Sequence, residues 1–173
     1  MAQIIASKNA LVLKTPEPEK RLCSCPKDKK ENCPLDGKCL SENIIYQATV
    51  KQPNAETKTY IGLCSTDFKA RLGTHRQSFK DPAKSNTSLS NYIHELKEKS
   101  IEPEISWRLI DRGKTYSPVH GVCQLCTREA FYITFYPRLA ELNSKSEIFE
   151  ACRHVKSKLL FPPVPGKKKP PGT

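Results

Sequence analysis

Two tyrosines, an arginine and a histidine are placed so that a compact fold could gather them around one phosphate group. Tyr46 and Tyr60 lie in two segments that predict paired strands, so their phenols can lie side by side on one sheet. Arg71 and His75 are four residues apart in a predicted helix and therefore share a face. A guanidinium forks onto phosphate oxygens, and a divalent cation held by one carboxylate supplies much of the remaining chemistry of phosphodiester hydrolysis.

The elements that must position these side chains follow from apolar periodicity and from turn residues. β-Branched and aromatic residues predict a hairpin of strands at 43–51 and 58–63, and alternation predicts a third strand at 104–111. Ser65 or Thr66 is the expected cap of the first helix. The helices are expected at about 67–79, 88–99, 125–135 and 146–158. The fold class is therefore α+β (α/β): a small three-stranded antiparallel sheet flanked by helices, with zinc-binding appendages.

The chain divides into four parts by composition. Residues 1–20 and the Pro- and Lys-rich residues 161–173 have few means of building a core and are expected to be tails. Residues 21–42 are rich in cysteine and poor in apolar side chains, so this segment needs a metal to hold it together. Residues 43–160 carry the predicted sheet, its helices and a second cysteine cluster, and form the main domain.

The first cysteine cluster, Cys23-x-Cys25-x7-Cys33-x5-Cys39, supplies four thiols within one short segment. Four thiolates form a closed tetrahedral zinc site, which is structural because it leaves no open position. The alternative is a flexible linker that happens to be rich in thiols.

The second cluster combines Cys123-x2-Cys126 with Cys152-x-His154 and would form a Cys₃His zinc site. His120 could replace His154 as the fourth ligand, and unliganded buried cysteines are the plainer alternative. Cys64 has no partner by spacing and is expected in the core. The sequence therefore predicts one or two structural Zn²⁺ ions.

Composition restricts the class of partner. The 173 residues carry a formal net charge of +11, which favours a polyanion because each neutralised phosphate releases a condensed counterion. No apolar run approaches the length of a membrane span, and no signal peptide is recognised, so an intracellular, reducing location is expected. Charge alone does not separate DNA from RNA, from an anionic membrane surface, or from a surface that is basic for solubility.

The order of these residues resembles the GIY-YIG nucleases. Tyr60-Ile61-Gly62 is followed by a helix with Arg71-x3-His75, by Glu129 in a later helix, and then by Asn143. The first triplet departs from the pattern, since Ile44-Ile45-Tyr46 has no glycine. The wider match is to the endonuclease domain of Penelope-like retroelements, carried by Cys33-Pro34-Leu35-x-Gly37-x-Cys39, Phe68-Lys69-x-Arg71, His75-x2-Ser78-Phe79, Leu96-Lys97, Leu125-Cys126-x2-Glu129 and Cys152-Arg153-His154.

The resemblance implies a GIY-YIG-like fold and a role for each residue. Glu129 would hold one catalytic Mg²⁺ or Mn²⁺, and Arg71 would clamp the scissile phosphate. Tyr46 would activate or position the attacking water, with Tyr60 and His75 assisting; Asn143 would support the site. A tyrosine has a pKa near 10, so a base role for Tyr46 requires a nearby cation.

The function expected from this resemblance is a metal-dependent DNA endonuclease that nicks its target for a Penelope-like retroelement. DNA would be the partner, no membrane is involved, a reverse transcriptase of the parent element is a possible further partner, and the location would be nuclear. The alternative is a zinc-stabilised module that binds nucleic acid and does not cut it. A complete set that includes Glu129 favours the enzyme, because a binding module has no use for that carboxylate.

Overall fold

The computed structural model describes residues 22–26, 33–53, 56–117, 121–144, 152 and 154. The expected tails 1–20 and 161–173, most of the expected helix 146–158, and His120 lie outside these residues. The elements in chain order are β1 (Ile44–Lys51), β2 (Lys58–Cys64), α2 (Phe68–Ser78), η2 (Pro82–Lys84), α3 (Ser88–Glu98), β3 (Glu104–Arg112), β4 (Tyr116–Ser117), β5 (Val122–Cys123), α4 (Gln124–Phe135) and η3 (Pro137–Leu139).

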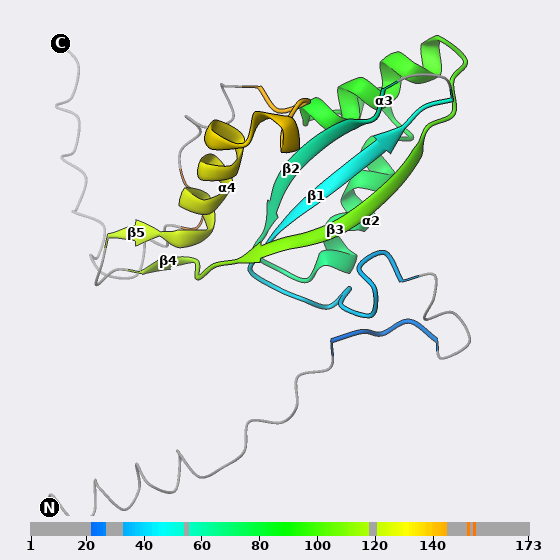
Figure 1. The fold of residues 1–173 in the computed structure, drawn as a ribbon. Coiled ribbons are helices and arrows are strands. Elements are labelled where there is room, and N and C mark those ends of the chain that lie inside the picture. The colour runs from blue at the N-terminus through cyan, green and yellow to red at the C-terminus, as the bar shows by residue number, and fades with distance from the viewer. Residues whose placement is uncertain are drawn as a thin grey trace, which may run out of the picture.

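The main sheet has three antiparallel strands in the order β2-β1-β3, so β2 is an edge strand (Figure 1). The β1–β2 hairpin pairs Tyr46 with Gly62 and Ala48 with Tyr60. Tyr46 and Tyr60 are therefore diagonal neighbours on the same face, because side chains alternate along each strand. The predicted three-stranded antiparallel sheet flanked by helices is confirmed.

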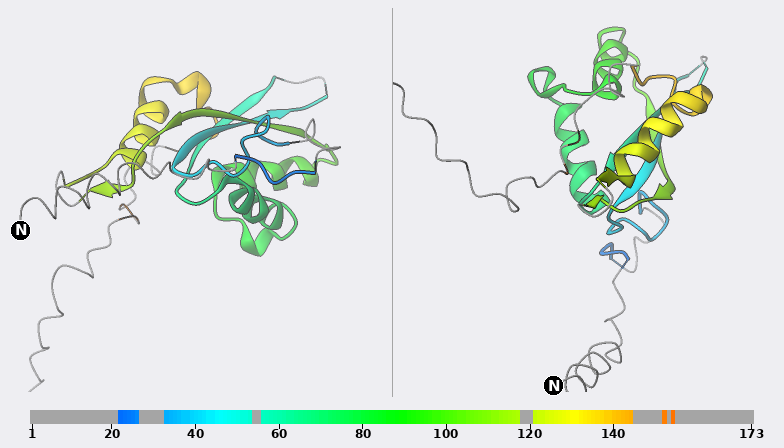
Figure 2. Two further views of the ribbon diagram at one scale, coloured as in Figure 1. Left: turned by 90° about the horizontal axis from the view of Figure 1, so that it is seen from below. Right: turned by 90° about the vertical axis from the view of Figure 1, so that its left-hand side faces the viewer.

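The two faces of the sheet are covered by different helices. Ile44, Tyr46, Ala48 and Val50 of β1 point toward α2 and α3 and form one buried cluster with apolar residues of both helices. Ile45 of β1 points to the other face, where its cluster includes Ile61 of β2 and Leu125 and Ile133 of α4. Figure 2 shows α2 and α3 on one side of the sheet and α4 on the other.

Local capping explains where the first two helices begin. The cap of α2 is Asp67, whose carboxylate accepts a hydrogen bond from the backbone N–H of Ala70, and not Ser65 or Thr66 as expected. Asp67 takes this role because its side chain lies directly before the first helical residue. Thr87 and Ser90 form a reciprocal capping box at the start of α3. These caps satisfy backbone N–H groups of the first turn and so set where the two helices begin.

One further feature of the fold was not expected. β4 and β5 form a small two-stranded ribbon between the predicted third strand and the predicted helix at 125–135, and this ribbon leads directly into α4. Among the described helices, none has the length and apolar character needed to cross a membrane.

Candidate active site and metal centres

A pocket of about 440 Å³ opens beside the outer edge of β2. Its wall combines Tyr60 from β2, Arg71 and Thr74 from α2, and Glu129 and Ile133 from α4. Helices from opposite faces of the sheet meet here because β2 is the last strand of the described sheet, so no further strand separates them. The pocket therefore gathers a phenol, a guanidinium and a carboxylate from segments far apart in the sequence.

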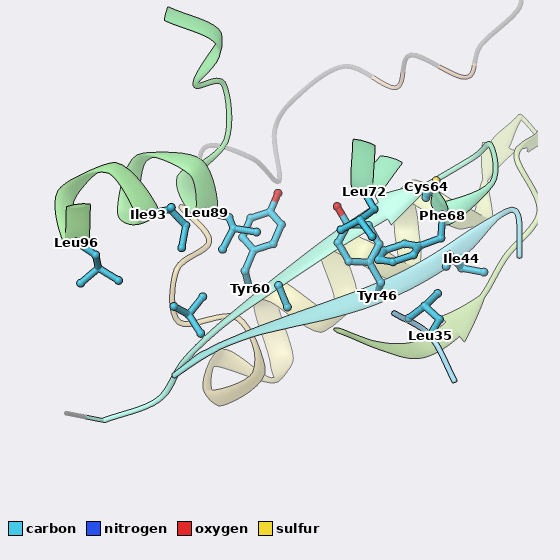
Figure 3. Packing of buried hydrophobic residues seen from close by; sticks show 12 residues of the cluster. Leu35, Ile44, Tyr46, Tyr60, Cys64, Phe68, Leu72, Leu89, Ile93 and Leu96 are labelled. Carbon is cyan, nitrogen blue, oxygen red and sulfur yellow. The ribbon is translucent and has the colours of Figure 1, made fainter. Parts of the chain in front are cut away.

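Three side chains form a chain of hydrogen bonds that leads from Arg71 in the pocket wall to two buried residues. Nε of Arg71 donates to the Tyr46 hydroxyl at 3.1 Å, and that hydroxyl lies 2.7 Å from Nε2 of His75. Tyr46 is 0% exposed and His75 is 1% exposed, so this chain is shielded from solvent. Figure 3 shows the phenols of Tyr46 and Tyr60 projecting from the same side of the hairpin. Tyr60 reaches the pocket, whereas Tyr46 is enclosed by its neighbours.

The protonation states of these groups follow from burial and from the Arg71 charge. Burial raises the pKa of Tyr46 to about 12, although the neighbouring guanidinium opposes the shift. Burial, together with the charge of Arg71, lowers the pKa of His75 to about 3. Burial alone would lower the pKa of Arg71, but the two tyrosines raise it overall, so the guanidinium stays charged. At neutral pH the Tyr46 hydroxyl is therefore protonated: it accepts a hydrogen bond from Arg71 and donates one to the neutral imidazole of His75.

Gly62 is the residue that makes room for the Tyr46 hydroxyl. It lies directly opposite Tyr46 in the hairpin, and a Cβ placed on it would lie 2.5 Å from the Tyr46 oxygen. Such a contact is far closer than packed atoms tolerate, and Tyr46 has no space to retreat because it is fully buried. The glycine of the Tyr60-Ile61-Gly62 triplet is therefore required by packing across the strand pair. Ile44, where the other triplet lacks a glycine, pairs with Cys64 and is fully buried.

We expect Gly62→Ala to lower the free energy of unfolding by about 1–3 kcal/mol, the usual cost of an overpacked core. The reason is that the new methyl group displaces the Tyr46 ring from Arg71 and His75. Chemical denaturation measures the loss. Gly73→Ala is the matched control, because a Cβ there meets nothing within 4 Å. That variant should be neutral or more stable by about 0.4–1 kcal/mol, since alanine restricts the unfolded chain. Equal stability of the two variants would contradict this explanation.

Asn143 is hydrogen-bonded to β2, the strand that carries the Tyr60-Ile61-Gly62 triplet. Its side-chain oxygen accepts from the N–H of Ile61 and its side-chain nitrogen donates to the C=O of Ile61, each at 2.8 Å. The backbone N–H of Leu142 also donates to the carbonyl of Thr59 at 2.9 Å. Asn143 thus fixes the edge strand next to Tyr60, and it is not one of the residues that line the pocket.

Several residues that line the pocket could not be identified as site residues from the sequence. Thr74 lies one turn after Arg71, and Asn86 and Thr87 come from the start of α3. Ser65 and Thr66 contribute hydroxyls from the turn before α2. Their position depends on how two helix N-termini pack near the β2 edge, which periodicity does not specify. Glu129 is the only carboxylate among the described residues that line the pocket.

The first cysteine cluster has the geometry of a zinc site. Three pairs of sulfur atoms, Cys23–Cys33, Cys25–Cys39 and Cys23–Cys39, lie 3.6–3.8 Å apart, and none of the four cysteines is in a disulfide. A tetrahedron with Zn–S bonds of about 2.3 Å has edges of about 3.8 Å. The four thiols could therefore hold zinc without rearrangement. Backbone hydrogen bonds from Phe68 and Lys69 to Ser41 and Cys39 join this segment to the start of α2.

The second cluster could also hold zinc, and it adjoins the pocket. The four side chains Cys123, Cys126, Cys152 and His154 offer ligand atoms within 4.8 Å of one another. Nδ1 of His154 lies 3.3 Å from the sulfur of Cys126 and 3.5 Å from that of Cys123. Cys126, Cys152 and His154 also line the pocket, so this candidate metal site forms part of its wall.

Comparison with protein-family models, with curated proteins and with solved structures finds no match.

Proposed function

We propose that this protein is a metal-dependent endonuclease of the GIY-YIG type that nicks DNA. The observation that carries the proposal is that Tyr60, Arg71 and Glu129 line one pocket, with Tyr46 bonded to Arg71 behind it. These groups match the requirements of phosphodiester hydrolysis: a charged donor for phosphoryl oxygens, a carboxylate for a cation, and a phenol beside the reacting group. The net charge of +11 supports a nucleic-acid substrate.

Arg71 would bind the scissile phosphate. Its Nε donates a hydrogen bond to the Tyr46 hydroxyl, which orients the guanidinium. The two terminal nitrogens would then bind phosphate oxygens in a bidentate manner. His75 is neutral and buried, so it holds the Tyr46 hydroxyl in place without adding charge. Tyr60 would face the reacting group, because it lines the pocket, while Tyr46 and His75 would act through Arg71 as positioning residues.

Glu129 would hold a single Mg²⁺ or Mn²⁺. One carboxylate within an open pocket fits Mg²⁺, which keeps several waters and completes its ligands with substrate phosphate. When bound, such a cation neutralises the phosphoryl oxygens and makes water a better nucleophile. The second zinc site would fix the direction of Glu129, because Cys126 and Glu129 lie one helical turn apart on α4.

The proposal is tested by plasmid relaxation. The zinc-loaded protein with Mg²⁺ or Mn²⁺ is expected to convert supercoiled plasmid into nicked circles, and to leave the plasmid intact when neither ion is added. Agarose gels separate the two forms. A protein that binds zinc and DNA yet cuts under neither ion would instead be a zinc-stabilised, non-catalytic nucleic-acid-binding module.

The biological setting is part of the same proposal. The resemblance to Penelope-like retroelements suggests that the nick opens a chromosomal target for insertion, which requires entry to the nucleus. A reverse transcriptase of the parent element would then be the partner that uses the exposed end.

A further inference from the structure

Four aromatic side chains cluster at the C-terminal end of α4, here called the aromatic surface: Phe131, Tyr132, Phe135 and the C-cap residue Tyr136. Adjacent rings have their centroids 5.1–5.8 Å apart, within the range of favourable aromatic pairs. Phe131, Phe135 and Tyr136 are nevertheless 44%, 68% and 47% exposed. Three large aromatic rings that touch one another and remain open to solvent mark an interaction site.

The aromatic surface is separate from the pocket. Phe131 and Phe135 are four residues apart and share a face of α4, whereas Cys126, Glu129, Ala130 and Ile133 form the pocket face. At 100° per residue these two faces lie on nearly opposite sides of the helix. No residue of the aromatic surface lines the pocket. The proposed cleavage chemistry therefore does not explain the exposed rings.

Basic residues lie beside this surface. Arg108 of β3 is exposed and donates to Gln47, and Gln47 donates to the carbonyl of Leu139, which places Arg108 near η3, the element that follows Tyr136. Arg138 of η3 is exposed and follows Tyr136 by two residues. Among the described residues, the ion pairs formed do not include Arg108 or Arg138. At the other end of the surface, Arg128 is paired with Asp111.

We propose that the aromatic surface binds an unpaired nucleic-acid strand. Bases of any sequence stack on exposed aromatic rings, and arginines beside the rings follow the phosphate backbone. A duplex hides the faces of its bases, so it can use only the arginines. The preference for a single strand thus comes from the rings, and the shared chemistry of stacked base and phosphate fits both single-stranded DNA and RNA.

Binding is tested without cleavage, using the zinc-loaded Glu129→Gln protein with no added Mg²⁺ or Mn²⁺. Fluorescence anisotropy is measured with labelled oligo(dT), oligo(U) and a duplex of the same length. Replacing Phe131 and Phe135 together by serine is expected to weaken single-strand binding by about twentyfold or more, since each stacked base contributes about fivefold or more. Duplex binding should stay within about twofold. The tighter of oligo(dT) and oligo(U) identifies the kind of strand.

Two further variants separate stacking from a change in the fold. Val122→Ser is the matched control, because Val122 is an exposed apolar residue, 47% exposed, outside the aromatic surface; single-strand binding should not change. Phe135→Trp keeps a stacking ring, so it should bind the strand as tightly as the parent, with quenching of the new indole. Unchanged single-strand binding in the double serine variant would overturn the proposal. So would a parent protein that sediments as a dimer and becomes monomeric in that variant with no loss of strand affinity, because the rings would then contact a second copy.

Discussion

Glu129→Gln is expected to lower the rate of plasmid nicking by about a thousandfold or more, while DNA affinity changes by no more than about twofold. The substitution keeps the size and polarity of the side chain and removes the charge that would hold the divalent cation. Stabilisation of a phosphoryl transition state by a bound cation is worth several kcal/mol, and about 4 kcal/mol corresponds to a thousandfold in rate. Nicking rates from plasmid gels and affinities from anisotropy measure the two effects.

The control for this prediction is Glu141→Gln, the same chemical change at an exposed acid. Glu141 forms a surface ion pair with Lys58 at 3.8 Å and does not line the pocket. Nicking by this variant should match the parent, because an exposed ion pair contributes little. If both variants nick as fast as the parent, the activity does not come from this pocket and the proposed function is wrong.

The second large effect concerns the first cysteine cluster. Cys39→Ser is expected to reduce the zinc content from two ions per chain to one and to lower the free energy of unfolding by about 5 kcal/mol or more, because metal binding is part of folding in such segments. For a domain of this size that loss lowers the melting temperature by about 10 °C or more. Cys39 is fully buried, and its sulfur lies 3.6 and 3.8 Å from those of Cys23 and Cys25. Mass spectrometry under native conditions and calorimetry provide the two measurements.

Cys64→Ser gives the matched control for the loss of zinc. Cys64 is buried and its thiol donates to the carbonyl of Thr66, but it belongs to neither cluster. This variant should keep both ions. Two ions bound by the Cys39→Ser protein would mean that the first cluster is not a four-thiolate site.

The main elements could be predicted because each has a pattern of its own. Leu89, Ile93 and Leu96 recur at helical spacing and give α3 one apolar face, and all three are buried in one cluster. The cap of α2 was predicted wrongly because three consecutive residues can all cap a helix, and backbone geometry selects Asp67. The ribbon of β4 and β5 was missed because strands of two residues show no periodicity.

The candidate site was predictable in its members and less so in its arrangement. Alternation places Tyr46 and Tyr60 on one face, but it does not indicate which phenol Arg71 and His75 will enclose. That outcome depends on how α2 packs across β1, a contact between segments distant in sequence. Spacing likewise predicts His154 as the fourth zinc ligand but leaves His120 as an alternative, and the structure places His154 against the three cysteines.

The bonds that Asn143 makes to β2 have a consequence for solubility. An open strand edge offers unpaired N–H and C=O groups on which another chain can add a strand, and this is a common route to aggregation. The amide of Asn143 satisfies both groups of Ile61, and Leu142 satisfies the carbonyl of Thr59, so the middle of this edge already has its partners. The pocket can therefore lie at the edge of the sheet without offering another molecule a free strand edge on which to add a strand.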